Sequence, residues 1–172
     1  MLLLLTAIVF GFMAVEARRA ARNERTQRTL GGVEPEHDVY ALMRVVYPGA
    51  FAAMLVEGAL RGTPPRPLVI TGAGVFVLAK ALKWWAMLTL DRFWTFRVIV
   101  IPGAPRIRKG PYRALRHPNY LGVIGELAGV ALITGALVAA VFSIPVFGAL
   151  ILKRIAIEER ALAGGPATQR DV

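Results

Sequence analysis

Residues 120–152 read YLGVIGELAGVALITGALVAAVFSIPVFGALIL, an apolar run in which only Gly135 and its neighbours can form a turn. Each arm of this run has about 16 residues, which is ~24 Å of α-helix at a rise of about 1.5 Å per residue. That length barely crosses the ~30 Å hydrocarbon core of a bilayer. The stretch therefore predicts a tight hairpin of two transmembrane helices.

Three further apolar runs precede the hairpin, at residues 2–15, 39–60 and 68–90. The second and third are separated by RGTPPRP at residues 61–67, which no helix can cross. The first run is shorter than the ~20 residues of a full crossing, and its arginines follow it, the opposite order to a cleaved signal peptide. The sequence thus predicts an all-α integral membrane protein with about five transmembrane helices.

The composition agrees with a membrane protein. Hydrophobic residues make up 56% of the 172 residues and charged residues 19%, and the mean hydropathy is +0.54. Soluble domains have fewer apolar and more charged residues, so the composition excludes an ordinary soluble enzyme. The length fits a single domain. The sequence contains no cysteine, which excludes disulfides, thiolate catalysis and cysteine-based zinc sites. No metal site is predicted.

The basic residues that give the net charge of +10 lie in the loops between the apolar runs. We therefore interpret them as a signal for membrane topology and not for nucleic-acid binding. Lys and Arg cluster in residues 16–38 and 91–119, whereas the turn near Gly135 holds no charge. The positive-inside rule predicts that these two segments and the C-terminus face the cytoplasm, with the N-terminus outside. The tail at residues 163–172 is rich in Gly and Pro, which predicts flexibility. The abundance of Ala, Arg, Gly and Val favours a bacterial inner membrane.

Two motifs concentrate polar side chains at this basic face. The first, GPYRALRHPNYLG at residues 110–122, places two Arg, one His, one Asn and two Tyr at the mouth of the hairpin. The second, RIAIEER at residues 154–160, puts Arg154 and Glu158 on one helical face. Carboxylates at a helix C-terminus are disfavoured by its dipole, which points to a cationic ligand. Composition alone also allows a basic interfacial loop and a solvated acidic helix end.

Several ionisable side chains fall inside the apolar runs. Snorkelling to the cytoplasmic interface is favoured for Lys80 and Lys83 over a role with substrate. Glu126 either pairs with a lysine or lines a substrate tunnel, and the sequence leaves both open. Gly125 and Gly129 have the GxxxG spacing that is typical of close helix packing.

The two motifs, with a short hairpin between them, resemble the isoprenylcysteine carboxyl methyltransferases, whose wider group includes phospholipid methyltransferases. The resemblance covers about residues 90–162 of a single transmembrane domain at residues 1–162. It implies a cytoplasmic pocket for S-adenosylmethionine and methyl transfer to a carboxylate, phenol or enol oxygen. The acceptor would be lipophilic and enter from the bilayer. In a bacterium a small lipid is favoured over a prenylated protein.

The resemblance also implies roles for individual residues. Arg154 would hold the acidic group of the substrate beside the methyl group, as the catalytic residue. Glu158 would bind the polar end of the cofactor, and Glu126 is a second candidate for contact with the substrate. The residues expected to bind or line the cofactor are Ala104, Pro105, Arg106, Ile107, Tyr112, His117, Pro118, Asn119, Tyr120 and Glu158.

Two other functions fit the sequence. A membrane reductase of sterol-reductase type that uses NADPH would share a similar hairpin, although only the basic loop could bind the cofactor phosphates. A protein without catalytic activity could use the same loop to bind anionic lipids. The bilayer is a partner in every case, and no nucleic acid is expected.

Overall fold

The computed structural model describes residues 1–35, 38–104 and 107–163. In these ranges it contains five α-helices, which are α1 (Leu2–Thr29), α2 (Tyr40–Arg61), α3 (Arg66–Leu90), α4 (Pro118–Thr134) and α5 (Leu137–Ala163). Two 3₁₀ helices, η1 (Asp91–Phe93) and η2 (Gly110–Arg113), lie in the connection between α3 and α4. The described residues form no β-strand beyond one isolated bridge, between Val33 and Val100. The predicted all-α architecture is confirmed.

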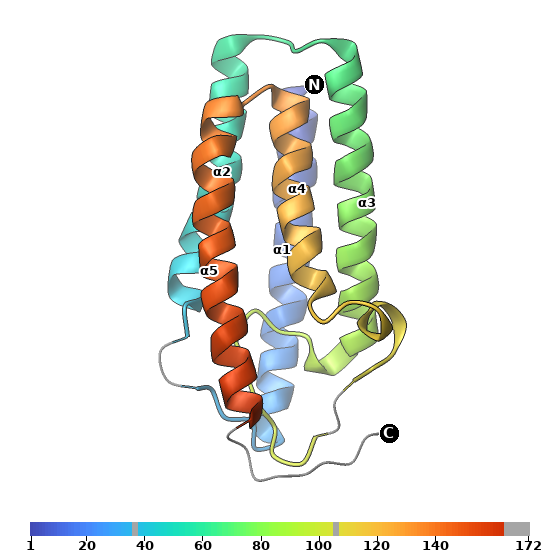
Figure 1. Ribbon diagram of the computed structural model, residues 1–172, viewed down its shortest axis with the longest axis vertical. Helices are drawn as coiled ribbons and strands as arrows, with labels where there is room; N and C mark the ends of the chain where they lie inside the picture. Colours follow the sequence, from blue (N-terminus) through green and yellow to red (C-terminus); the bar gives the residue numbers. More distant parts are fainter. Residues whose placement is uncertain (36–37, 105–106, 164–172) are drawn as a thin grey trace.

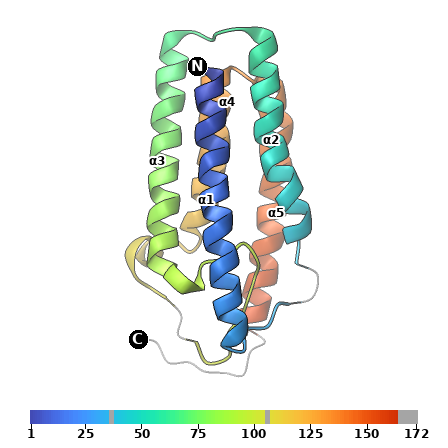
Figure 2. The ribbon, with the colours of Figure 1, turned by 180° about the vertical axis from the view of Figure 1, so that it is seen from behind.

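The helices form an up-and-down bundle. The N-terminus, the α2–α3 turn and the α4–α5 turn lie at one end of the bundle, and the remaining connections lie at the other end (Figure 1). Seen from behind, α1 lies between α2 and α3 (Figure 2). The described residues of the basic segments 16–38 and 91–119 therefore gather at the same end of the bundle as the last turns of α5.

Within the described part of the chain, three helical stretches are long and apolar enough to cross a membrane: Tyr40–Arg61, Arg66–Phe93 and Leu137–Ala161. They identify an integral membrane protein. α4 is apolar but has only 17 residues. α1 runs without a break from the apolar stretch at residues 2–15 into the polar one that follows, and it ends at Thr29. Five crossings of the bilayer stay a prediction.

The hairpin turn lies where the sequence places it. α4 ends before Gly135, whose φ of +68° lies in the left-handed region that favours glycine. The first turn of α5 is capped from a neighbouring helix, because the Glu57 carboxylate accepts the backbone N–H groups of Val138 (3.1 Å) and Ala139 (2.6 Å). These donors have no partner within their own helix. Glu57 thereby ties the hairpin to α2.

Glycines allow α3 and α4 to approach closely. A Cβ atom at Gly129 would lie 2.7 Å from the backbone nitrogen of Phe76, and one at Gly72 would lie 2.7 Å from that of Ile133. At Gly125 the added atom would lie 2.7 Å from a side chain of α3. The two backbones are thus in direct contact, which confirms the close packing predicted from the GxxxG spacing.

Four ionisable side chains form a buried ion-pair cluster inside the bundle: Glu16, Lys80, Lys83 and Glu126, with exposed fractions of 1%, 8%, 2% and 2%. The Lys80 Nζ atom lies 3.1 Å from Glu16 and 2.9 Å from Glu126. The Lys83 Nζ atom lies 2.6 Å from Glu16 and 3.4 Å from Glu126. Each lysine contacts both carboxylates, so two positive and two negative charges balance.

The ion-pair cluster shows that the expectation for Lys80 and Lys83 is wrong, and it distinguishes between the two alternatives for Glu126. Lys80 and Lys83 do not snorkel, because both find carboxylates inside the bundle, where a paired charge costs far less than an unpaired one. Glu126 pairs with lysines, the first of its two alternatives, and also accepts a hydrogen bond of 2.6 Å from the Tyr47 hydroxyl. The cluster and Tyr47 together join α1, α2, α3 and α4.

Replacing Lys83 by methionine should destabilise the protein by about 3–5 kcal/mol, because it leaves a buried carboxylate without a counter-charge. The double variant Lys83→Met/Glu16→Gln restores the charge balance with Lys80 and Glu126 and should lose less. Thermal unfolding in one detergent compares the two with the wild type. A double variant that is less stable than the single one would contradict the charge-balance argument.

Candidate functional site

A cavity of about 1220 Å³ lies at the basic end of the bundle. Its inner wall includes apolar side chains of α1, α2, α4 and α5, among them Phe10, Met13, Met43, Val123 and Phe147. Its outer part is lined by the connection between α3 and α4, which contributes Arg97, Arg108 and Arg116. The cavity thus joins an apolar interior to a basic mouth, a shape suited to a ligand with a polar head and an apolar tail.

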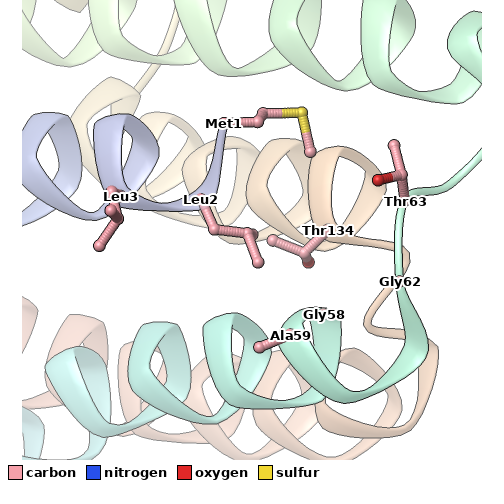
Figure 3. A pocket seen from close by; sticks show the side chains of 8 residues that line it. All are labelled: Met1, Leu2, Leu3, Gly58, Ala59, Gly62, Thr63 and Thr134. Atoms are coloured by element: carbon pink, nitrogen blue, oxygen red, sulfur yellow. The ribbon is translucent and has the colours of Figure 1, made fainter.

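A smaller pocket of about 430 Å³ lies at the opposite end. Figure 3 shows it between the start of α1, the end of α2 and the end of α4. Its described lining residues are Met1, Leu2, Leu3, Gly58, Ala59, Gly62, Thr63 and Thr134. None of these carries an ionisable side chain, so the candidate site is the larger cavity.

Most of the side chains that the sequence predicts for the site line this larger cavity. They are Ala104, Ile107, Tyr112, His117, Asn119, Tyr120, Arg154 and Glu158. Pro118 is buried as the first residue of α4 and does not line the cavity. Glu126 lies in the ion-pair cluster, and Pro105 and Arg106 lie outside the described residues.

The two motifs meet through a chain of hydrogen bonds. Arg154 Nε donates to the Tyr120 hydroxyl at 2.8 Å, and this hydroxyl donates to Glu158 Oε2 at 3.1 Å. Arg154 is only 6% exposed. Tyr120 comes from the first turn of α4, where a proline at the first helical position favours the start of a helix. At the cavity wall, a cation (Arg154) and an anion (Glu158) are therefore both hydrogen-bonded to the hydroxyl of Tyr120.

Two further rings adjoin this chain of hydrogen bonds. The imidazole of His117 stacks on the ring of Tyr120, with centroids 5.5 Å apart and an interplanar angle of 26°. His117 Nε2 lies 3.7 Å from the Glu159 carboxylate. Burial, with a smaller effect from the negative charge of Glu158, raises the pKa of Tyr112 above its ordinary value, so this phenol keeps its proton at neutral pH. The site therefore offers neutral aromatic surfaces beside a carboxylate.

The polar half of α1 holds the start of the α3–α4 connection. Asn23 Nδ2 donates to the carbonyls of Asp91 (2.7 Å) and Trp94 (2.8 Å), and Gln27 bonds to the same segment. Trp94 Nε1 in turn donates to Asn119 Oδ1 at 3.2 Å. Sequence reasoning missed Asn23 and Gln27, although two amides spaced i, i+4 on one helix face are a signal for a shared partner.

Asp38 is a further residue that sequence reasoning missed. Its side chain is 5% exposed, and Oδ1 lies 3.6 Å from Nη1 of Arg154. The same carboxylate accepts the backbone N–H groups of Tyr40 and Val98, each at 3.1 Å. An acidic residue just before an apolar run is a capping signal. Nothing in the sequence indicates that Val98 and Arg154 lie beside it.

The residues that follow Val98 line the cavity in an extended form. Val100 exchanges two backbone hydrogen bonds of 2.9 Å with Val33, in the loop between α1 and α2. Arg97 adds ion pairs to Glu34 (2.6 Å) and Glu24 (3.2 Å). The backbone at Val100 is therefore extended, and the loop before α2 holds it in place.

Comparisons with known proteins agree with the motifs. The model of the isoprenylcysteine carboxyl methyltransferase (ICMT) family matches residues 71–164, which include both motifs. The chain is 31% identical over 161 residues to the uncharacterized protein YpbQ of Bacillus subtilis, covering 92% of this chain and 95% of that protein. It is 23% identical over 143 residues to an uncharacterized protein of Haemophilus influenzae, covering 83% of each. No solved structure shows a significant match.

Proposed function

The chain belongs to the isoprenylcysteine carboxyl methyltransferase family, and we propose that it transfers a methyl group from S-adenosylmethionine to an oxygen of a lipophilic acceptor. Family membership implies a membrane methyltransferase, whereas the cofactor and the acceptor belong to the proposal. The observation that carries it is the chain of hydrogen bonds through Arg154, Tyr120 and Glu158. It places groups of opposite charge side by side at the wall of a single cavity.

The residues around Glu158 fit the proposed cofactor. When bound, S-adenosylmethionine supplies a methyl group on a positively charged sulfur, and it also carries an ammonium group. Glu158 can accept a charge-assisted hydrogen bond from the ammonium group and attract the sulfonium charge, and Tyr120 occupies only its Oε2 atom. The rings of Tyr112 and His117 offer surfaces on which a cation or a planar base can rest.

Arg154 fits the proposed acceptor. An oxygen nucleophile must be an anion or close to one, and a neighbouring guanidinium favours the ionised form. Methyl transfer is an in-line displacement, so positioning supplies most of the catalysis. The apolar wall formed by Phe10, Met13 and Phe147 would hold the tail of the acceptor while its head group meets Arg154. We propose that the reaction occurs at the cytoplasmic face of a bacterial inner membrane.

The Glu158→Gln variant should weaken S-adenosylmethionine binding about tenfold or more, since the loss of a charge-assisted hydrogen bond costs about 1.5–3 kcal/mol. His117→Ala and Tyr120→Phe should weaken it less. Glu159→Gln is the comparison variant: Glu159 lines the same cavity, but its side chain is half-exposed, so the change should weaken binding less than Glu158→Gln does. Calorimetry on the purified protein measures all four variants. Unchanged affinity in Glu158→Gln, or tighter binding of NADPH to the wild type, would overturn the proposed cofactor site.

Arg154→Ala should bind the cofactor normally but lower turnover by about 10²-fold or more, the effect of losing one electrostatic stabiliser. Arg154→Lys should recover only part of the activity, because it retains the charge but not the planar fork of donors. Methyl transfer to dodecanoate and to a long-chain alkylphenol in lipid nanodiscs provides the measurement. Turnover within a few-fold of the wild type in both variants would mean that Arg154 has only a structural role.

A single introduced cysteine tests the proposed orientation, because the natural chain has none. Ala104→Cys, at the cavity, should react with a membrane-impermeant maleimide only from the cytoplasmic side. Thr63→Cys, in the turn at the other end of the bundle, is the control and should react only from outside. The opposite pattern would invert the topology.

A further inference from the structure

The proposed function leaves the ion pair between Asp38 and Arg154 unexplained. Asp38 lies in the loop before α2, and Arg154 lies near the C-terminal end of α5. Both side chains are nearly inaccessible to solvent, with exposed fractions of 5% and 7%. A buried pair of this kind is costly to break on one side only, because the remaining charge is left without a partner.

The guanidinium of Arg154 is held from two directions. Its Nε atom donates to the Tyr120 hydroxyl at 2.8 Å, and its Nη1 atom lies 3.6 Å from Asp38 Oδ1. Because the guanidinium is planar, contacts at two different nitrogens define the orientation of the plane. Among the described residues, Nη2 has no hydrogen-bond or ion-pair partner, and Arg154 lines the cavity, so Nη2 is left for a ligand.

Asp38 is itself held firmly. Oδ1 accepts the N–H of Tyr40 and Oδ2 accepts the N–H of Val98, each at 3.1 Å. The first bond fixes the carboxylate to the start of α2. The second fixes it to the extended segment that lines the cavity. The carboxylate therefore stays in place if the guanidinium of Arg154 rotates.

We propose that Asp38 is a positioning residue for the acceptor site: its carboxylate sets the plane of the Arg154 guanidinium and competes with an anionic acceptor for its charge. This inference rests on the proposed role of Arg154. Asp38 lowers the attraction of the site for a bound anion and, in return, directs Nη2 into the cavity. The Asp38 carboxylate therefore weakens the binding of an anionic acceptor but favours its methylation.

Removing the carboxylate charge should shift binding and turnover in opposite directions. The free charge of Arg154 then attracts a carboxylate ligand more strongly, while its guanidinium loses one of its two fixed contacts. Simple damage to the site would weaken binding and turnover together. The split between the two quantities separates a positioning role from a structural one.

The test uses Asp38→Asn in the full chain in nanodiscs, with ¹³C-labelled dodecanoate as the ligand and dodecanol as its uncharged control. Dodecanoate should bind about 3–10-fold more tightly than to the wild type, and dodecanol should bind unchanged. The kcat for dodecanoate methylation should fall about tenfold, as for the loss of an ion-paired orienting partner. Asp38→Ser, which keeps a capping oxygen for the start of α2, makes the same prediction if the asparagine variant does not fold.

Glu34→Gln is the matched control. Glu34 holds the same extended segment through Arg97 at 2.6 Å but does not contact Arg154 in the structure, so dodecanoate binding should stay unchanged. In an Arg154→Ala background, Asp38→Asn should lower kcat no further, because the guanidinium that it orients is gone.

Weaker or unchanged dodecanoate binding in Asp38→Asn, or an equal fall in kcat in the Arg154→Ala background, would overturn this inference. Wild-type protein that binds dodecanoate no better than dodecanol would overturn it as well. Failure of the proposed function looks different: the wild type would not methylate any acceptor, although dodecanoate binding and its response to Asp38→Asn could still be measured.

Discussion

The buried ion-pair cluster of Glu16, Lys80, Lys83 and Glu126 is the constraint on which the rest of the bundle depends. The desolvation of four charges is offset only when every partner is present and correctly placed. Because the members come from α1, α3 and α4, and Tyr47 adds α2, the cluster fixes the relative positions of four helices. The cavity adjoins the cluster, since Glu16, Lys83 and Tyr47 are among its lining residues.

The cavity consequently has two polar layers with an apolar wall between them. Tyr47 stacks on Phe147 of α5, with ring centroids 5.0 Å apart. Arg154 follows Phe147 by about two helical turns on α5, which is roughly 10 Å along the helix axis. α5 therefore carries both the apolar wall and the charged pair of the site. This arrangement matches an amphiphilic acceptor whose head group stops at Arg154.

Local sequence signals predicted much of this structure. The turns at residues 61–67 and at Gly135, the close packing at Gly125 and Gly129, and the position of the two motifs at one end all follow from Pro, Gly and hydrophobic periodicity. Each of these depends on residues near one another in the chain or on the alternating direction of the helices.

The interactions that were missed depend on tertiary contacts. Glu16 follows the first apolar run, and nothing nearby in the sequence indicates a partner for it, but α1 continues as a helix and carries its carboxylate to the lysines of α3. Asp38 meets Arg154 only because the loop before α2 folds against the end of α5. No periodicity or spacing encodes such a meeting.

The cluster also constrains the order in which the protein is assembled in the membrane. Glu16 leaves the ribosome long before Lys83, its partner 67 residues later in the chain, and Glu126 follows later still. An unpaired charge is expensive inside a bilayer, so α1 cannot settle at its final depth on its own. Insertion of this protein is therefore completed late and cooperatively, when α3 and α4 bring the counter-charges that let the first helix take its place.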